Sequence, residues 1–135
     1  MAYINCKVNG YPVRALIGTA AGFSSISRAC ANRCKIAPMI DNSQRRMANT
    51  GGGDASITGR IQLCQIQIED DFLVTSFEIL DTLPLDMVLG TDWLDRHDCL
   101  CHFGSFMRIK TTGTEVKFVE GDENSHFTSY MVLAK

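Results

Sequence analysis

The sequence GRIQLCQIQIEDDFLVTSFEILDTLPLDMVLGTDWLDRHDC, residues 59–99, decides the fold. Its first part alternates apolar and polar residues, which is typical of a half-buried strand. The alternation places on one face Ile61, Leu63, Gln65 and Gln67, and on the other Gln62, Cys64, Ile66 and Ile68. An acidic turn at 69–71 then leads to a second predicted strand, FLVTSFEIL. The short apolar strand DMVLG ends at a glycine, and TDWLDRHD predicts one or two helical turns.

The residues before this stretch predict a hairpin and a short helix. In YINCKVNGYPVRALI, residues 3–17, the alternation breaks at Asn9-Gly10, a dipeptide that favours a tight turn between two strands. The segment SSISRACANRC predicts a short helix with Ser24 or Ser25 as its N-cap.

Two further segments are polar. Residues 41–59 are rich in glycine, and we interpret them as a mobile loop or the tip of a hairpin. Short strands are predicted in CLCHF, FMRIKT and EVKFVE, and from Gly121 the composition indicates a C-terminal tail.

The composition limits the partners that we expect. A net charge of −2 on 135 residues gives no electrostatic reason for binding nucleic acid or an anionic membrane. No apolar run approaches the roughly 20 residues of a membrane span, and MAYINCKVNG lacks the features of a signal peptide. We therefore expect the cytoplasm, with the nucleus as a second location. In that setting we expect free thiols at the six cysteines, Cys6, Cys30, Cys34, Cys64, Cys99 and Cys101.

Two segments of the chain are similar to each other, ALIGTA at 15–20 and MVLGTD at 87–92. Each has three apolar residues followed by Gly-Thr. Small β-barrels use such glycines where two strands cross closely, because glycine lets backbones approach. Apolar residues before glycine are common, so this similarity alone carries little weight.

Residues 59–99, together with YINCKVNGYPVRALI, resemble the DNA-damage-inducible (Ddi-type) retroviral-like aspartic proteases. The resemblance is colinear over residues 2–120. DMVLGTDWL is also similar to the corresponding segment of retrotransposon proteases, and NCKVNG is shared with the nuclear-receptor-interacting relatives of the Ddi family.

The resemblance implies an all-β, retropepsin-like closed barrel with one or two short helices. It also implies a symmetric homodimer, with the active site on the two-fold axis, that accepts an extended peptide or protein substrate. The protease domain would span residues 1–122, with a flap at about 45–59 and a tail at 123–135. Substrate contacts are expected from the flap residues Gly51, Gly52 and Gly53.

The catalytic turn of this family has the pattern Asp-Thr/Ser-Gly-Ala. Aligned on it, Gly18 stands where the aspartate belongs, Thr19 matches the hydroxyl position, Ala20 replaces the glycine and Ala21 matches the alanine. Aspartic proteases activate water with two carboxylates, one from each chain of a homodimer. A chain with glycine at this position is therefore predicted to be inactive. Asp92 is the other acid to consider, but its place in the first turn of a helix favours a structural role.

Other groups of reactive residues do not form a recognisable site. HDCLCH contains the zinc-ligand types His97, Cys99, Cys101 and His102, but its spacing matches no standard zinc motif. The segment TGGGDASITG lacks the lysine of a phosphate-binding loop. We expect neither a metal nor a cofactor.

The sequence leaves three functions open. The first is the protease domain of a Ddi-type protein linked to ubiquitin and the proteasome through domains outside this chain, inactive because of Gly18. The second is a natural pseudoprotease that dimerises and binds peptides. The third is an adaptor like the nuclear-receptor-interacting relatives, although the chain contains no Leu-x-x-Leu-Leu motif.

Overall fold

Strands dominate residues 1–49 and 54–120, which the computed structural model describes. The strands are β1 (Tyr3–Val8), β2 (Tyr11–Ile17), β3 (Ser25–Ser27), β4 (Arg46–Asn49), β5 (Asp54–Ile68), β6 (Asp71–Leu80), β7 (Met87–Leu89), β8 (Cys99–His102), β9 (Phe106–Ile109) and β10 (Thr114–Lys117). The helical segments are α1 (Arg28–Arg33), the 3-10 turn η1 (Ala37–Met39) and α2 (Thr91–Arg96). The boundary predicted after residue 122 and the tail at 123–135 lie outside the described residues.

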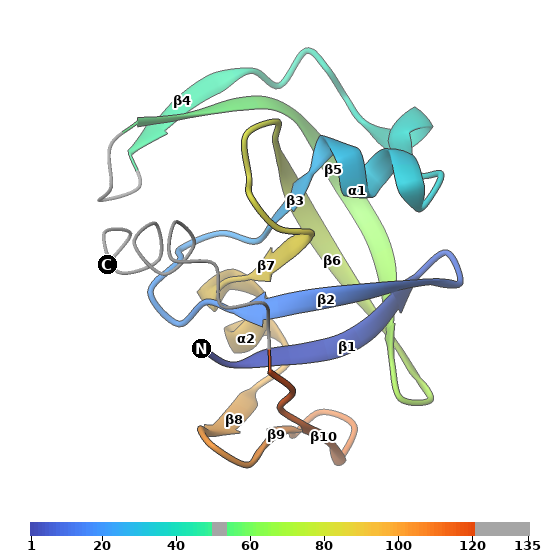
Figure 1. Cartoon of the computed structure of the whole chain (residues 1–135), viewed down its shortest axis with the longest axis vertical. Helices are drawn as coiled ribbons and strands as arrows, with labels where there is room; N and C mark the ends of the chain where they lie inside the picture. Colours follow the sequence, from blue (N-terminus) through green and yellow to red (C-terminus); the bar gives the residue numbers. More distant parts are fainter. Residues whose placement is uncertain (50–53, 121–135) are drawn as a thin grey trace.

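Six strands close into a barrel in the order β1-β2-β7-β3-β6-β5, because β1 also pairs with β5 (Figure 1). β4 adds to the outer edge of β5, and β8, β9 and β10 form a separate sheet at the bottom of the view. The prediction of an all-β closed barrel with two short helices is confirmed. No helix within the described residues is long and apolar enough to cross a membrane.

The hairpin predicted at Asn9-Gly10 joins β1 to β2. Both turn residues have positive φ, 51° for Asn9 and 81° for Gly10, as a two-residue hairpin turn requires. The strands then pair in antiparallel register from Val8 and Tyr11 outward. This prediction is confirmed.

The two similar segments of the sequence lie side by side. β2 and β7 pair in parallel, with Ala15 opposite Met87 and Ile17 opposite Leu89. Past the end of β7, a Cβ built on Gly90 would lie 2.6 Å from the carbonyl oxygen of Phe23. Backbone therefore approaches Gly90 closely, but it belongs to the loop at residues 21–23 and not to a crossing strand.

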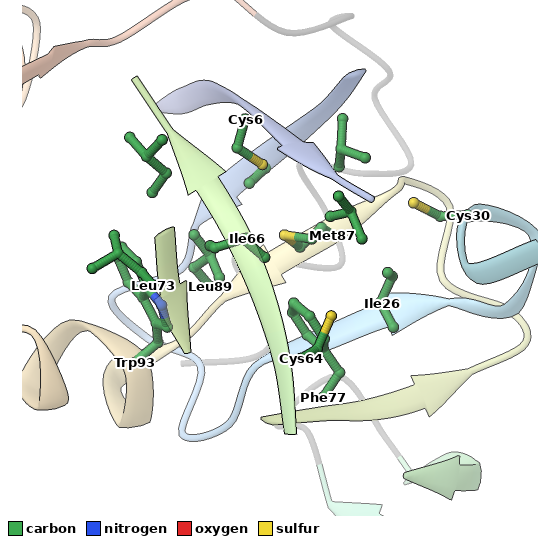
Figure 2. Close-up of a cluster of buried hydrophobic side chains, with 14 of the residues drawn as sticks. Cys6, Ile26, Cys30, Cys64, Ile66, Leu73, Phe77, Met87, Leu89 and Trp93 are labelled. Carbon is green, nitrogen blue, oxygen red and sulfur yellow. The ribbon is translucent and has the colours of Figure 1, made fainter. Parts of the chain in front are cut away.

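One prediction about β5, which of its side chains face the core, was wrong. Ile61 was expected on the face opposite Cys64 and Ile66, yet all three are at most 4% exposed and belong to the same apolar cluster. Figure 2 shows Cys64 and Ile66 in that cluster. The pairing register with β6 shifts between Ile61 and Cys64, where β5 carries one extra residue. Such a bulge reverses the alternation along the strand, and it turns Leu63 outward to 59% exposure.

The helix predicted after residue 24 begins later than expected. Ser27 is the N-cap, and its Oγ accepts a hydrogen bond from the amide of Cys30 at 2.9 Å. Ser24 or Ser25 as N-cap was therefore wrong, because Ser25 belongs to β3. That strand pairs with both β6 and β7, so its residues are fixed before the helix begins.

The polar residues 41–59 contain the two arms of a hairpin rather than only a loop. β4 and the start of β5 pair from Arg46 opposite Ile57 to Asn49 opposite Asp54, and we call these two paired arms, residues 46–49 and 54–57, the 46–57 hairpin. In Figure 1 it arches over β3 and β7 at the top of the view. The predicted substrate-contact residues Gly51, Gly52 and Gly53 lie outside the described residues.

Candidate active site

The turn that aligns with the family's catalytic turn follows β2 directly and is fixed by backbone hydrogen bonds. The amide of Gly18 donates to the carbonyl oxygen of Leu89 at 2.9 Å, and the amide of Ala21 donates to Gly18 at 2.9 Å. The amide of Thr91 then donates to the carbonyl oxygen of Ala21 at 2.8 Å. The turn is thus attached at both ends to the junction between β7 and α2.

The side chains of this turn carry no acid or base. Gly18 is buried, Thr19 is exposed, and Ala20 and Ala21 are half-buried. The structure thus places Gly18, Thr19 and Ala20 together in one rigid turn.

Asp92 lies close to this turn and is occupied by structural hydrogen bonds. Its Oδ1 accepts from the Ser24 hydroxyl and from the Trp93 amide, each at 2.7 Å, and its Oδ2 accepts from the Ser24 amide at 3.1 Å. The Ser24 hydroxyl in turn accepts from the amide of Gly90 at 3.0 Å. The prediction of an acid in the first turn of a helix is confirmed, and Asp92 joins the segment after the catalytic turn to α2.

A second apolar cluster connects the turn to the 46–57 hairpin. Its buried members are Tyr3, Leu16, Ile57, Leu80, Leu83 and Val88. Ala21 and Phe23 from the turn side, and Ala48 and Ala55 from the hairpin, pack against it. The hairpin and the turn therefore share one apolar contact surface, separate from the core inside the barrel.

The base of the hairpin contains a buried ion-pair group that the sequence analysis missed. Glu78 on β6 is 2% exposed, and its carboxylate accepts from Arg60 on β5 and from Arg46 on β4. Beside it, the Thr58 hydroxyl donates to Asp81 at 2.9 Å. The signal that could have found Glu78 is its place as the single charged residue in the apolar run FLVTSFEIL.

The residues of HDCLCH are not brought together. His97 is buried and its Nε2 lies 2.9 Å from the carbonyl oxygen of Val74, while His102 is exposed. Burial raises the pKa of Cys99 to about 12, so this thiol stays protonated at neutral pH. Within residues 1–49 and 54–120, no three His, Cys, Asp or Glu side chains are placed to hold a metal ion.

The other cysteines are packing residues. All six cysteines are free thiols, and Cys6, Cys30, Cys34 and Cys64 are buried. Figure 2 shows Cys6, Cys30 and Cys64 among the apolar side chains of the core. Burial raises the pKa of Cys64 to about 11 and that of Cys6 to about 12, which makes both thiols poor nucleophiles.

Two surface cavities lie away from the turn. The larger, about 1020 Å³, lies against β1, β2 and residues 84–86. The second, about 730 Å³, is lined by Met39, Leu63 and Phe72 among others. Neither lining includes a residue from 18 to 21.

Comparison with known proteins adds to this geometry. The aspartyl protease family matches residues 1–102. The chain is 47% identical over 120 residues to Protein DDI1 homolog 2 of Danio rerio, covering 88% of this chain and 29% of that protein. To Protein DDI1 homolog 2 of Homo sapiens it is 44% identical over 124 residues, covering 91% of this chain and 31% of that protein. The chain thus spans about three tenths of the length of the curated relatives that it matches.

A solved structure has the same fold. The crystal structure of the retroviral protease-like domain of Ddi1 from Leishmania major superposes with a TM-score of 0.76 at 22% sequence identity. The match covers 92% of this chain and 97% of that chain. This likeness confirms the retropepsin-like barrel.

Proposed function

The chain belongs to the aspartyl protease family as a Ddi-type retropepsin-like domain, and from this premise we propose that it is inactive as a protease and binds extended peptides as a homodimer. The observation that carries the proposal is the turn after β2. It has the rigid attachment that a catalytic turn needs, yet Gly18 offers no carboxylate.

Peptide hydrolysis by this family needs two carboxylates that share a proton and activate one water molecule. A symmetric dimer of this chain would place two copies of Gly18 at the axis, so neither acid nor base is available. Asp92 does not replace them, because its two oxygens already accept from Ser24 and Trp93. Loss of a dyad that acts as a unit lowers the rate by several orders of magnitude.

Two features support retained peptide binding. Half-buried residues at the edge of the second apolar cluster, among them Phe23 on the turn side and Ala48 on the hairpin, can contact apolar side chains of a ligand. Among the described strands, β4 pairs with β5 alone, so its outer edge has backbone groups available for strand addition. Both features act without a catalytic group.

The wider role of the domain follows from the family. We propose that it belongs to a protein that handles ubiquitinated substrates with the proteasome through domains outside this chain, in the cytoplasm and the nucleus. The alternative is a natural pseudoprotease whose whole role is dimerisation and peptide binding, or an adaptor like the nuclear-receptor-interacting relatives.

Fluorescence anisotropy with a labelled, extended octapeptide carrying two central apolar residues tests the proposal. We expect saturable binding in the micromolar to millimolar range, and mass spectrometry of the same samples should show the peptide intact. Absence of saturable binding at millimolar protein would refute the binding function. Cleavage of the peptide between the apolar residues would refute the inactivity.

A further inference from the structure

We propose that the carboxylate of Glu78 is the ionic anchor of the 46–57 hairpin, and that it controls how tightly the hairpin holds a bound peptide. The part about peptides rests on the proposed function above. The anchor itself rests on contacts within this chain.

Glu78 is placed to face the hairpin. It lies on β6 between Phe77 and Ile79, which are both 0% exposed inside the barrel, so alternation turns its side chain to the opposite face. That is the face of Leu80, which belongs to the second apolar cluster under the hairpin. The backbone of Glu78 is fixed too, since its amide donates to the carbonyl oxygen of Ser24 at 3.0 Å.

The two oxygens of Glu78 accept from one arginine on β5, just past the hairpin, and from one arginine on β4. Arg60 lies directly opposite Glu78 in the β5–β6 register and donates to Oε1. Arg46 reaches across β5 from the outer strand β4 and donates to Oε2 at 3.1 Å. Burying a carboxylate is costly unless it is paired and hydrogen-bonded, and here one arginine pairs with each oxygen of a side chain that is 2% exposed.

The anchor lies where the hairpin leaves the barrel. The β5–β6 register shifts between Ile57 and Gly59, next to Arg60. A Cβ built on Gly59 would lie 2.6 Å from Cγ2 of Ile40, so residue 40 closely approaches the strand at this bulge. Only Arg46 joins the outer arm to the body of the barrel by an ion pair among the described residues. Breaking this pair should therefore free β4 and leave the barrel closed.

Arg46→Met tests the anchor, and Arg45→Met is its matched control. Both variants remove one positive charge from neighbouring exposed arginines, but among residues 1–49 and 54–120 the Arg45 guanidinium donates a hydrogen bond only to the carbonyl oxygen of Asn42. In Arg46→Met, Glu78 keeps Arg60 as its partner, so the fold is retained. Arg46→Lys keeps the positive charge, so it should retain part of the ionic contact with Glu78 and change the hairpin less than Arg46→Met does.

Hydrogen exchange of the free protein is the first measurement. We expect amides of β4 to exchange about 5-fold faster in Arg46→Met, because a half-exposed charged hydrogen bond is lost. The exchange rates of amides in β1 and β2 should not change in Arg46→Met. In Arg45→Met, the exchange rates of all these amides should equal those of the unmodified chain. Equal exchange in the two variants, or acceleration spread evenly over the barrel, would overturn the anchor.

The dissociation rate of the labelled octapeptide is the second measurement. It should rise about 5-fold in Arg46→Met, stay unchanged in Arg45→Met and be intermediate in Arg46→Lys. Faster exchange at β4 with an unchanged dissociation rate would refute control over the ligand. If the unmodified chain binds no peptide, the proposed function fails, while the exchange data still decide whether Glu78 anchors the hairpin.

Discussion

Replacing Asp92 by alanine should destabilise the domain by about 3 kcal/mol. Its carboxylate accepts three hydrogen bonds, from the Ser24 amide, the Ser24 hydroxyl and the Trp93 amide. Hydrogen bonds to a charged group contribute about 1.5–3 kcal/mol each when they are shielded from water. The Asp92 side chain is exposed, so solvent screening lowers this to about 1 kcal/mol each. The sum is a large fraction of the 5–15 kcal/mol by which domains are stable.

Urea unfolding of Asp92→Ala and Asp95→Ala, followed by circular dichroism, tests this value. Asp95 lies one position before the end of α2 and is also exposed, and its side chain makes no hydrogen bond or ion pair within the described residues. Its replacement should therefore change stability by less than about 0.5 kcal/mol. Both variants must be compared at one protein concentration, because dimerisation shifts apparent stability. Equal losses in the two variants would show that Asp92 does not join the turn to α2.

Three further predictions concern assembly, close packing and the thiols. Light scattering at micromolar concentration should give about 30 kDa, twice the 14.9 kDa of one chain, and a monomer alone would contradict the homodimer. Gly90→Ala should lower the free energy of unfolding in urea by more than about 3 kcal/mol, because the Cβ of the new alanine would lie 2.7 Å from the carbonyl oxygen of Ala21. A decrease of less than about 1 kcal/mol would show that residue 90 and Ala21 are not tightly packed. Burial raises the pKa of the thiols of Cys6, Cys64 and Cys99. The free energy of unfolding should therefore fall between about pH 8.5 and pH 11, by roughly 1.4 kcal/mol per pH unit for each of these thiols. The native state holds these protons after the unfolded state has released them, so stability that does not change over this range would contradict the burial of the thiols.

The strand content of the fold follows from local sequence. The Asn9-Gly10 turn and the alternation in β5 are local patterns, and both predicted strands that the structure contains. The bulge between Ile61 and Cys64 could not be predicted in this way, because it depends on how two strands pair. The N-cap at Ser27 was missed for a similar reason, since β3 is defined by its neighbours β6 and β7.

The candidate site was predictable only where the residue types carry the chemistry. Gly18 in the aligned turn indicated the missing acid, and the position of Asp92 indicated a helix-end role. The hydrogen bonds from Ser24 to Asp92 span 68 residues of sequence, so no local pattern reveals them. The same holds for Arg46 and Glu78, which lie 32 residues apart.

A cleavage assay on this chain and on the double variant Gly18→Asp, Ala20→Gly, from about pH 3.5 to about pH 7.5, tests most directly whether Gly18 removes the catalytic acid. We expect no cleavage by the unmodified chain. We expect cleavage by the double variant, blocked by a transition-state analogue of aspartic proteases. Cleavage by the unmodified chain that the same analogue blocks would contradict the claim that Gly18 removes the catalytic acid. A double variant that folds and dimerises but cuts nothing would contradict the claim that the rest of the protease site is intact.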